Sequence, residues 1–331
     1  MSDKRLQLVG IGNAIVDVVS RTEDSFIEKH GIAKGAMTLI DADQAEALYG
    51  EMGPGVEVSG GSVANATAGF AALGGKAAFI GKVREDQLGK VFAHDLRAAG
   101  VEYGTPQAQA GDPTARCLIL VTPDGQRTMN TYLGASQGLG EDDIDPALIA
   151  AAETVYLEGY LWDPPEAKKA FRKAMEIAKQ AGTRVAFTLS DAFCVDRYRS
   201  EFRELVDSHI DILFANEEEI KSLYETDSFD DAMGTLGSKV QHAALTRSEK
   251  GSVVVSGERV FEIRPEKVER VVDATGAGDL YSAGFLFGLA NGYTPEDAGR
   301  IASICAAEII SHYGARPEED LKALIRDGLA A

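Results

Sequence analysis

The sequence predicts a three-layer α/β fold, in which helices cover both faces of a mostly parallel central sheet and a small second β-sheet is added. Short apolar runs alternate with amphipathic segments from about residue 77 onward, which is typical of parallel strands buried between helices. One hairpin near residue 125 interrupts this alternation, so we place it in the second sheet. The 331 residues, 45% of them hydrophobic, suffice for one full-sized core.

Composition and charge limit the classes of partner. The formal net charge of −19 argues against nucleic acid or an anionic membrane surface, although a phosphorylated ligand needs only a local cradle. No segment approaches the roughly 18 continuous apolar residues of a membrane span. Cys117, Cys194 and Cys305 are too scattered for a disulfide framework or a zinc site. We therefore expect a cytoplasmic protein with small-molecule partners, either a monomer or a homodimer.

The N-terminal segment predicts two strands in succession. The apolar run at 6–11 ends in Ile11, after a glycine, and has the form of a buried strand. Its Gly-Ile-Gly looks like the start of a dinucleotide-binding motif, but Ile15 stands where the third glycine belongs. An extended run at 15–19 also follows where a helix would begin, which excludes a Rossmann unit. Asp17 is a carboxylate inside this second run, and the pattern leaves open whether it faces solvent or a ligand.

A double glycine precedes an alanine-rich helix. Gly60 and Gly61 let a ligand approach the backbone closely. Asn65 lies about one turn into the helix, where asparagine is a mediocre helix former, so it is a candidate for a binding role. No GxxxxGK[ST] sequence occurs in the chain, which excludes a P-loop enzyme.

Further strands and helices follow in order along the chain. The hairpin joins extended runs at 115–122 and 127–133 through Pro123-Asp-Gly125-Gln. The other expected elements are strand 77–83, helix 86–99, strand 154–158, helix 165–180, strands 184–188, 210–215 and 243–246, and a hairpin of 252–255 with 259–263.

Asn216 and Glu219 directly follow the strand expected at 210–215. In open α/β sheets, ligands gather at the carboxyl ends of strands. An amide and a carboxylate there could help to place Mg²⁺ and its waters beside a triphosphate. The alternative is that the acidic residues only suit the dipole of the helix that begins here.

The segment from 271 to 290 carries the strongest chemical signal. Val271 and Val272 read as the end of a buried strand, a turn of small residues follows, and 279–290 has the apolar spacing of a helix. A glycine turn at a helix start leaves backbone N–H groups free for an anion. Asp279 lies in the first turn of this helix, so a carboxylate faces the same point. Phosphoryl transfer to a hydroxyl needs this pair, although Asp279 could also merely complement the helix dipole.

Taken together, these stretches resemble the three sequence marks of the ribokinase-like (PfkB) small-molecule kinases. The marks are Gly60-Gly61 with Asn65, Asn216-x-x-Glu219, and the run 273–279, in the family's order across nearly the whole chain. Within that family the chain is most similar to the adenosine kinases. This closer similarity rests on the segments 12–17, 113–117, 189–193 and 206–219.

The resemblance implies one kinase domain over residues 1–331, with a β lid contributed by approximately 13–41 and 112–134. It implies ATP-dependent phosphorylation of a primary hydroxyl, with ATP and Mg²⁺ bound and adenosine converted to AMP. Asp279 would be the catalytic base. The residues at the start of its helix would form the anion hole, namely Gly276, Ala277 and Gly278.

The resemblance also assigns roles to the remaining site residues. Arg127 would reach towards the transferring phosphate, and Asp273 would contribute to an optional site for a monovalent cation such as K⁺. Asn216 and Glu219 would place Mg²⁺ indirectly. The acceptor would contact Asn13, Asp17, Gly60, Gly61, Asn65, Met129 and Trp162. The nucleotide would contact Asn216, Glu219, Thr246, Gly251, Thr275 and Gly278.

Three departures from the family pattern bear on the substrate. Ser248 stands where the family commonly has glycine, two residues after Thr246. The stretch 159–165 is shorter than in animal adenosine kinases, where an aromatic ring stacks on the base. That leaves open whether Tyr160, Leu161 or Trp162 takes this place, with Leu39 also expected near the base. Arg116 would suit an anionic acceptor such as a sugar acid.

Two alternatives to a nucleoside kinase stay open. One is a sugar or sugar-acid kinase of the ribokinase, fructokinase or keto-deoxygluconate kinase type. The other is a catalytically inactive nucleotide-binding protein.

Overall fold

The computed structural model describes residues 4–330 and contains two sheets. The larger sheet has nine strands in the order β14-β13-β12-β11-β10-β9-β1-β5-β6. Its inner strands pair in parallel, and β12, β13 and β14 pair antiparallel at one edge. Its strands are β1 (Leu6–Ile11), β5 (Ala77–Ile80), β6 (Glu102–Tyr103), β9 (Ala152–Glu158), β10 (Arg184–Thr188), β11 (Ile212–Asn216), β12 (His242–Thr246), β13 (Ser252–Ser256) and β14 (Arg259–Ile263).

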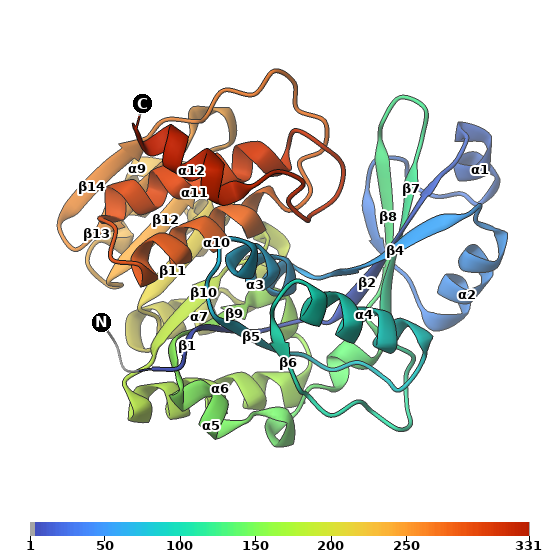
Figure 1. Ribbon diagram of the computed structural model, residues 1–331, viewed down its shortest axis with the longest axis horizontal. Coiled ribbons are helices and arrows are strands. Elements are labelled where there is room, and N and C mark those ends of the chain that lie inside the picture. Colours follow the sequence, from blue (N-terminus) through green and yellow to red (C-terminus); the bar gives the residue numbers. More distant parts are fainter. Residues whose placement is uncertain (1–3, 331) are drawn as a thin grey trace.

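The smaller sheet projects from one side of the large domain (Figure 1) and has five strands in the order β3-β8-β7-β2-β4. Its strands are β2 (Ile15–Arg21), β3 (Met37–Leu39), β4 (Gly55–Gly60), β7 (Ala115–Val121) and β8 (Arg127–Tyr132). Two helices accompany it, α1 (Asp24–Lys29) and α2 (Ala42–Glu51). We call these five strands and two helices the lid.

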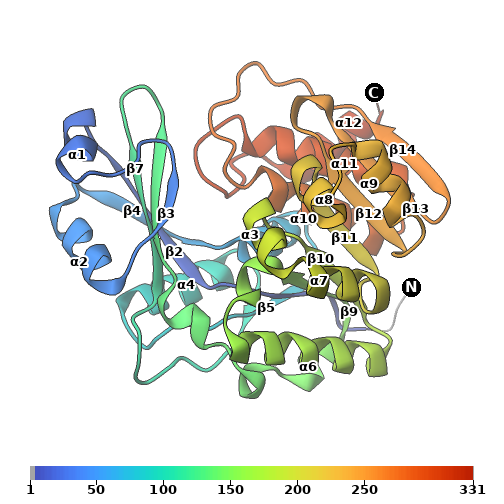
Figure 2. The ribbon, with the colours of Figure 1, turned by 180° about the vertical axis from the view of Figure 1, so that it is seen from behind.

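Helices cover both faces of the large sheet. Figure 1 shows one face and Figure 2 the other. The first face carries α3 (Ser62–Ala72), α4 (Gln87–Ala98), α10 (Ala277–Ala290), α11 (Pro295–Ile309) and, outside α11, α12 (Leu321–Ala330). The second face carries α5 (Pro146–Ala150), α6 (Pro165–Ala181), α7 (Ala192–Ser208), α8 (Glu217–Tyr224) and α9 (Phe229–Leu236). Four short 3-10 turns complete the chain, η1 (Gly134–Gly138), η2 (Glu141–Asp143), η3 (Gly159–Trp162) and η4 (Ser248–Lys250).

The apolar runs of the sequence have a simple structural cause. Strands of the central sheet are buried on both faces, so consecutive residues enter opposite cores. In β1, Leu8 belongs to the core beneath α3 and α10, whereas Val9 and Ile11 belong to the core beneath α6. The three-layer α/β fold with a second small sheet is therefore confirmed.

Two details of the predicted elements differ in the structure. β4 joins the lid by pairing antiparallel with β2, although it lies outside the two ranges expected to form the lid. The strand predicted at Val271 and Val272 is wrong. Val271 is 56% exposed, and the N–H of Val272 donates to the carbonyl of Ile310 at the end of α11. Neither valine belongs to a strand of either sheet.

The chain crosses between the two sheets close to the predicted motifs. It leaves β1 at Ile11 and enters the lid at Ile15, and it returns from β4 to α3 at Gly61. The residues of these crossings therefore lie where the lid meets the large domain. None of the helices described between residues 4 and 330 combines the length and the apolar character that a membrane span requires.

Candidate active site

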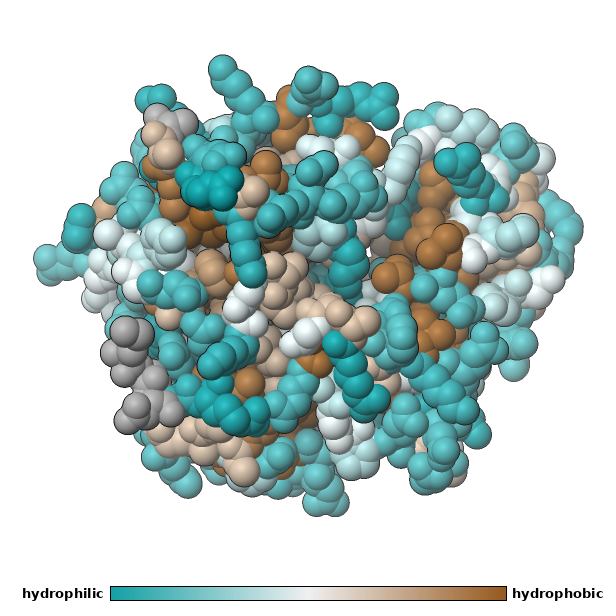
Figure 3. Space-filling view, in the orientation of Figure 1, coloured by the Kyte–Doolittle hydropathy of each residue, from teal (hydrophilic) through white to brown (hydrophobic). Residues whose placement is uncertain are grey.

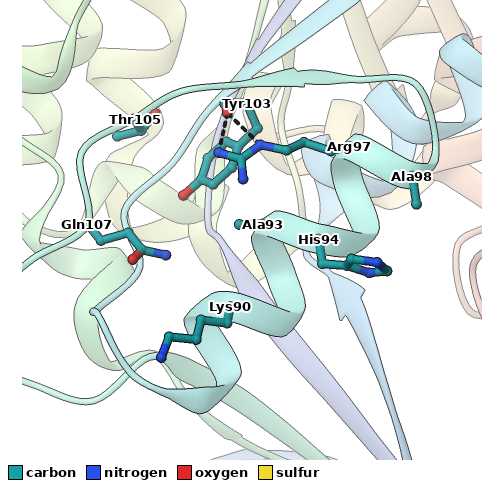
Figure 4. Close-up of a pocket in the computed structure, with 8 residues that line it drawn as sticks. All are labelled: Lys90, Ala93, His94, Arg97, Ala98, Tyr103, Thr105 and Gln107. Carbon is teal, nitrogen blue, oxygen red and sulfur yellow. Dashed lines mark hydrogen bonds between the residues drawn. The ribbon is translucent and has the colours of Figure 1, made fainter.

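A cavity of about 910 Å³ lies between the lid and the large domain. Lid strands β2, β7 and β8 contribute to its wall, and so do the carboxyl ends of β9 to β12 and the start of α10. Most of the predicted site residues line it, namely Asp17, Gly61, Asn65, Met129, Asn216, Glu219, Thr246, Gly251, Thr275, Gly276, Ala277, Gly278 and Asp279. A smaller hollow of about 620 Å³ beside α4 contains none of them (Figure 4).

The start of α10 forms one end of this cavity. Its N-cap is Gly276, with a φ of 79° in the left-handed region that favours glycine. A side chain there would also be too close to Ala315, because a Cβ would lie 2.8 Å from the Ala315 Cβ. Gly276, Ala277 and Gly278 all line the cavity. The free N–H groups of a first helical turn, together with the helix dipole, therefore face a space that an anion can enter.

Asp279 lies beside this anion-binding turn and is held by two donors. Its carboxylate accepts hydrogen bonds from the Ser62 hydroxyl at 2.7 Å and from the Asn65 amide nitrogen at 3.0 Å. Burial raises the pKa of Asp279 to about 6, while these two bonds and the nearby Arg316 act in the opposite direction. The carboxylate is therefore ionised at neutral pH and can still accept a proton, as a general base must.

Arg316 completes this arrangement. Its guanidinium donates to the Asn65 side-chain oxygen and, at 2.6 and 2.9 Å, to the carbonyl and hydroxyl of Ser59. Sequence reasoning missed this residue, because it lies in the loop after α11, outside every motif. Only the fold brings it to α3.

Asp17 faces the cavity from the lid rather than bulk solvent. Its carboxylate lies directly over Gly60, where a Cβ would come within 2.5 Å of the Oδ2 atom. Glycine at position 60 is therefore required for this approach. Burial raises the pKa of Asp17 to about 6, with Arg316 and Arg127 opposing the rise and Asp279 adding to it. Asp17 and Asp279 thus line one cavity from the lid and from the large domain.

The other end of the cavity lies at the ends of β11 and β12. Asn216 and Glu219 cap α8 reciprocally: Asn216 accepts from the Glu219 N–H at 2.8 Å, and Glu219 accepts from the Asn216 N–H at 3.0 Å. Burial raises the pKa of Glu219 to about 7. Within residues 4–330 no group of three His, Cys, Asp or Glu could hold a metal ion. The residues fit Mg²⁺ only as outer contacts of an ion that phosphates and water surround.

Two residues in the loop after β12 adopt the left-handed backbone conformation that favours glycine. Ser248 adopts a φ of 50° and Gly251 a φ of 85°, and both residues line the cavity. A Cβ at Gly251 would lie 2.2 Å from the Ile263 carbonyl oxygen. The left-handed conformation at Ser248 costs about 1–2 kcal/mol relative to glycine.

Residues 25–321 match the sequence model of the family described as pfkB family carbohydrate kinase. The chain belongs to this family. It is similar over 99% of its length to an adenosine kinase structure from Sinorhizobium meliloti, with 51% identity, a TM-score of 0.90 and coverage of 100% of that chain. It is also similar over 99% of its length to a probable sugar kinase from Rhizobium etli CFN 42, with 47% identity, a TM-score of 0.92 and coverage of 100% of that chain. Arabidopsis thaliana probable fructokinase-6, chloroplastic, is 29% identical over 82% of this chain and 74% of its own.

In this pfkB kinase, Asp273 does not fit the predicted role of a cation ligand. Its carboxylate pairs with the Arg127 guanidinium, and both side chains are buried. The same carboxylate also accepts from the Gly314 N–H at 3.0 Å and from the Thr275 N–H and hydroxyl at 3.0 and 2.7 Å. Both oxygens are therefore engaged, and Arg127 already supplies the positive charge. Arg127 itself does not line the cavity, in contrast to the prediction that it reaches the phosphate.

Asn13 of this kinase, predicted to contact the acceptor, does not line the cavity and is engaged by other side chains. Its backbone N–H and amide nitrogen donate to the buried Glu158 carboxylate at 2.8 and 2.6 Å, and its side-chain oxygen accepts from Ser136 at 2.9 Å. Glu158 also accepts from the Val63 N–H at 2.9 Å. These bonds fix the crossing from β1 into the lid.

Of the three residues considered for the stacking role, Tyr160, Leu161 and Trp162, only Tyr160 lines the cavity, where Tyr156, Phe214 and Tyr281 are further aromatic residues. Leu161 and Trp162 are fully buried in the core beneath α6. The Trp162 indole nitrogen donates to Glu201 at 3.1 Å. The structure therefore places Trp162 in the core and away from the cavity in which we predicted that it contacts the acceptor. Leu39 also lies outside the cavity, 60% exposed on the edge strand β3. Figure 3 shows apolar surface on the part of the lid that borders the large domain.

Arg116 faces the opposite side of the lid from the cavity. Side chains alternate along a strand, and the neighbouring Cys117 points into the cavity. Arg116 instead pairs with Glu46 of α2 at 2.9 Å and lies over the Tyr49 ring. It therefore provides no positive charge for an anionic acceptor in this arrangement.

Proposed function

We propose that the protein is an ATP-dependent kinase that phosphorylates the 5′ hydroxyl of adenosine. The observation that carries this proposal is the composition of the cavity wall around Asp17. Lid side chains from β2, β7 and β8 give it an apolar roof, made of Ile15, Cys117, Ile119 and Met129. Tyr160 adds an aromatic ring. A purine base needs such a surface, whereas a sugar alone presents hydroxyls on all sides.

The ribose of the acceptor would be recognised by polar groups beneath that roof. Asp17 can accept hydrogen bonds from two adjacent hydroxyls, and its closeness to Gly60 brings the acceptor near the backbone of Gly61. The primary hydroxyl would then point towards Asp279. The similarity to the Sinorhizobium meliloti adenosine kinase, at 51% identity, supports the same acceptor.

Transfer would proceed by direct displacement. The acceptor oxygen attacks the γ-phosphorus of ATP, the bond from that phosphorus to the bridging oxygen of ADP breaks, and the hydroxyl proton passes to Asp279. The N–H groups from Gly276 to Gly278 stabilise charge on the transferred phosphoryl group. A bound Mg²⁺ would neutralise phosphate charge, with Asn216 and Glu219 helping to orient its water ligands.

A sugar kinase remains the second candidate, because the 47% identical Rhizobium etli protein is described as a probable sugar kinase. Asp17 and Gly61 would bind the hydroxyls of a free sugar equally well. A sugar acid fits less well, because Arg116 is held on the outer side of the lid.

A panel of acceptors tests the proposal. The purified protein, with ATP and Mg²⁺, is assayed for ADP release with adenosine, guanosine, inosine, ribose, fructose and 2-keto-3-deoxygluconate. We expect adenosine to give the highest kcat/KM. A higher value for ribose or fructose would replace adenosine by a sugar, and no turnover with any acceptor would favour a catalytically inactive nucleotide-binding protein.

A further inference from the structure

Arg316 is a half-buried cation that none of the sequence motifs includes. It lies in the loop between α11 and α12, which extends towards the lid (Figure 1). Its guanidinium is bonded to Ser59, near the end of lid strand β4, and to Asn65 on α3. Three separate parts of the chain therefore meet at this side chain.

We propose that Arg316 is a positioning residue for phosphoryl transfer, which orients the Asn65 amide and keeps the carboxylates of Asp17 and Asp279 ionised. This inference rests on the proposed function, because it takes Asp279 as the catalytic base.

The first part follows from hydrogen-bond polarity. An arginine can only donate, so the Asn65 atom that faces Arg316 is the carbonyl oxygen. The amide nitrogen must then face Asp279, to which it donates at 3.0 Å. If the amide turned over, two donors would face each other at Arg316 and two acceptors at Asp279. Arg316 thus fixes the orientation in which Asn65 supports the base.

The second part follows from charge. Arg316 is the cation that opposes the effect of burial on both carboxyls, and burial in turn lowers the pKa of Arg316 itself. The other titratable groups that face Asp279 or Asp17 are Cys117, Arg127, Tyr156, Glu158 and Tyr160, and Asp95 faces Arg316. Of these groups only Arg127 is a cation, and it is paired with Asp273. Loss of the Arg316 charge therefore raises the pKa of Asp279.

A purely structural role is the alternative to exclude. Arg316 joins β4 to α3, and Ser59 is held from the other side by Asp95, which accepts the Ser59 N–H at 2.9 Å. If Arg316 only held these segments together, its loss would lower activity by the same factor at every pH. A positioning role moves the pH dependence as well.

The test compares Arg316→Gln and Arg316→Lys with the wild-type enzyme, using adenosine and ATP between pH 5 and 9. Glutamine keeps a donor for Asn65 but removes the charge, so we expect the acid limb of kcat/KM to move up by about one pH unit. Lysine keeps the charge, and its limb stays at the wild-type position while kcat falls. An unmoved limb in Arg316→Gln, or a limb moved equally in Arg316→Lys, overturns the inference.

Arg97→Gln is the matched control. Arg97 also joins two segments, because its Nε and Nη2 on α4 donate to the carbonyl of Tyr103 in β6 at 3.1 and 2.9 Å (Figure 4). It lies outside the active-site cavity. We expect this variant to keep the wild-type pH profile, and a shifted limb here would show that loss of any buttressing arginine produces the effect.

A second readout needs no substrate. At pH 8 both Asp17 and Asp279 are ionised and lose a favourable partner in Arg316→Gln, whereas at pH 5 both are largely protonated. We therefore expect the loss of unfolding free energy in urea to be larger at pH 8 than at pH 5. Equal losses at both pH values overturn the inference even if adenosine is not the acceptor. If Asp279→Asn stays fully active, the proposed base fails instead, which separates the two hypotheses.

Discussion

Replacing Asp279 by asparagine tests the catalytic role of this carboxylate separately from its effect on the stability of the fold. Asparagine keeps the shape of the side chain but cannot accept the hydroxyl proton. Loss of a general base lowers the rate about 10²–10⁴-fold. The two hydrogen bonds survive, because the new carbonyl oxygen can accept from Asn65 while the Ser62 hydroxyl rotates to accept from the new amide.

The same substitution is expected to stabilise the fold at neutral pH. Folding raises the pKa of Asp279 from 3.8 to about 6, so the carboxyl group disfavours the folded state increasingly as the pH rises above about 4, with the full effect above about 6. A shift of about 2 units corresponds to about 3 kcal/mol at most. The carboxylate is only partly buried, and solvent screening reduces this figure to about 1–2 kcal/mol. Asparagine carries no charge and avoids the cost, so its advantage at pH 7.5 shrinks by about half at pH 5.

Urea unfolding at pH 7.5 and pH 5, together with kcat for adenosine, measures both effects. Asp297→Asn is the control, because Asp297 also lies in the first turn of a helix, α11, but outside the cavity. If Asp279 only complemented a helix dipole, both variants would lose a few tenths of a kcal/mol and remain active. An Asp279→Asn enzyme that keeps more than about a tenth of wild-type kcat would refute the role as base.

Three further predictions concern other parts of the cavity, one of them with a control variant outside it. Asp17→Ala should weaken adenosine binding and abolish the preference over 2′-deoxyadenosine, expected at about 10²-fold or more in kcat/KM; unchanged KM values would contradict this. Tyr160→Ala should raise KM for adenosine about tenfold or more, from 1–3 kcal/mol of stacking, whereas Trp162→Phe should leave it unchanged. Ser248→Gly should raise the urea-measured unfolding free energy by about 0.5–1 kcal/mol, since relief of left-handed strain exceeds the added chain entropy; a loss of stability would refute the strain.

Features that depend on residues close together in the chain could be predicted from the sequence alone. The helix start with Asp279 is encoded in seven successive positions, 273–279, so its turn and its carboxylate could be predicted together. The alternation of buried strands and helices is local in the same sense. Val271 and Val272 show the limit, because two apolar residues match a strand, but here the chain follows an irregular path and the Val272 N–H donates to the Ile310 carbonyl at the end of α11.

Contacts between distant segments could not be read from spacing. Arg316 reaches Asn65 across 251 positions of sequence. The choice between Tyr160 and Trp162 depends on the 3-10 turn η3, whose tight geometry turns successive side chains to different sides. Nor does the apolar run of β7 show which face of the strand Arg116 occupies. That face is set by α2, which supplies its partner Glu46.

The interleaving of the lid with the large domain has a consequence for the order of folding. The central lid pair joins β2 to β7 in parallel, about a hundred residues apart, with α3, β5 and α4 of the large domain between them in the chain. Bringing β2 and β7 together closes a long loop and costs conformational entropy, which is offset only by the lid contacts that form afterwards. We therefore expect the lid to form after strands β9 to β14 of the large sheet, which pair with near neighbours in sequence, and the lid amides to gain protection from hydrogen exchange later than theirs during refolding.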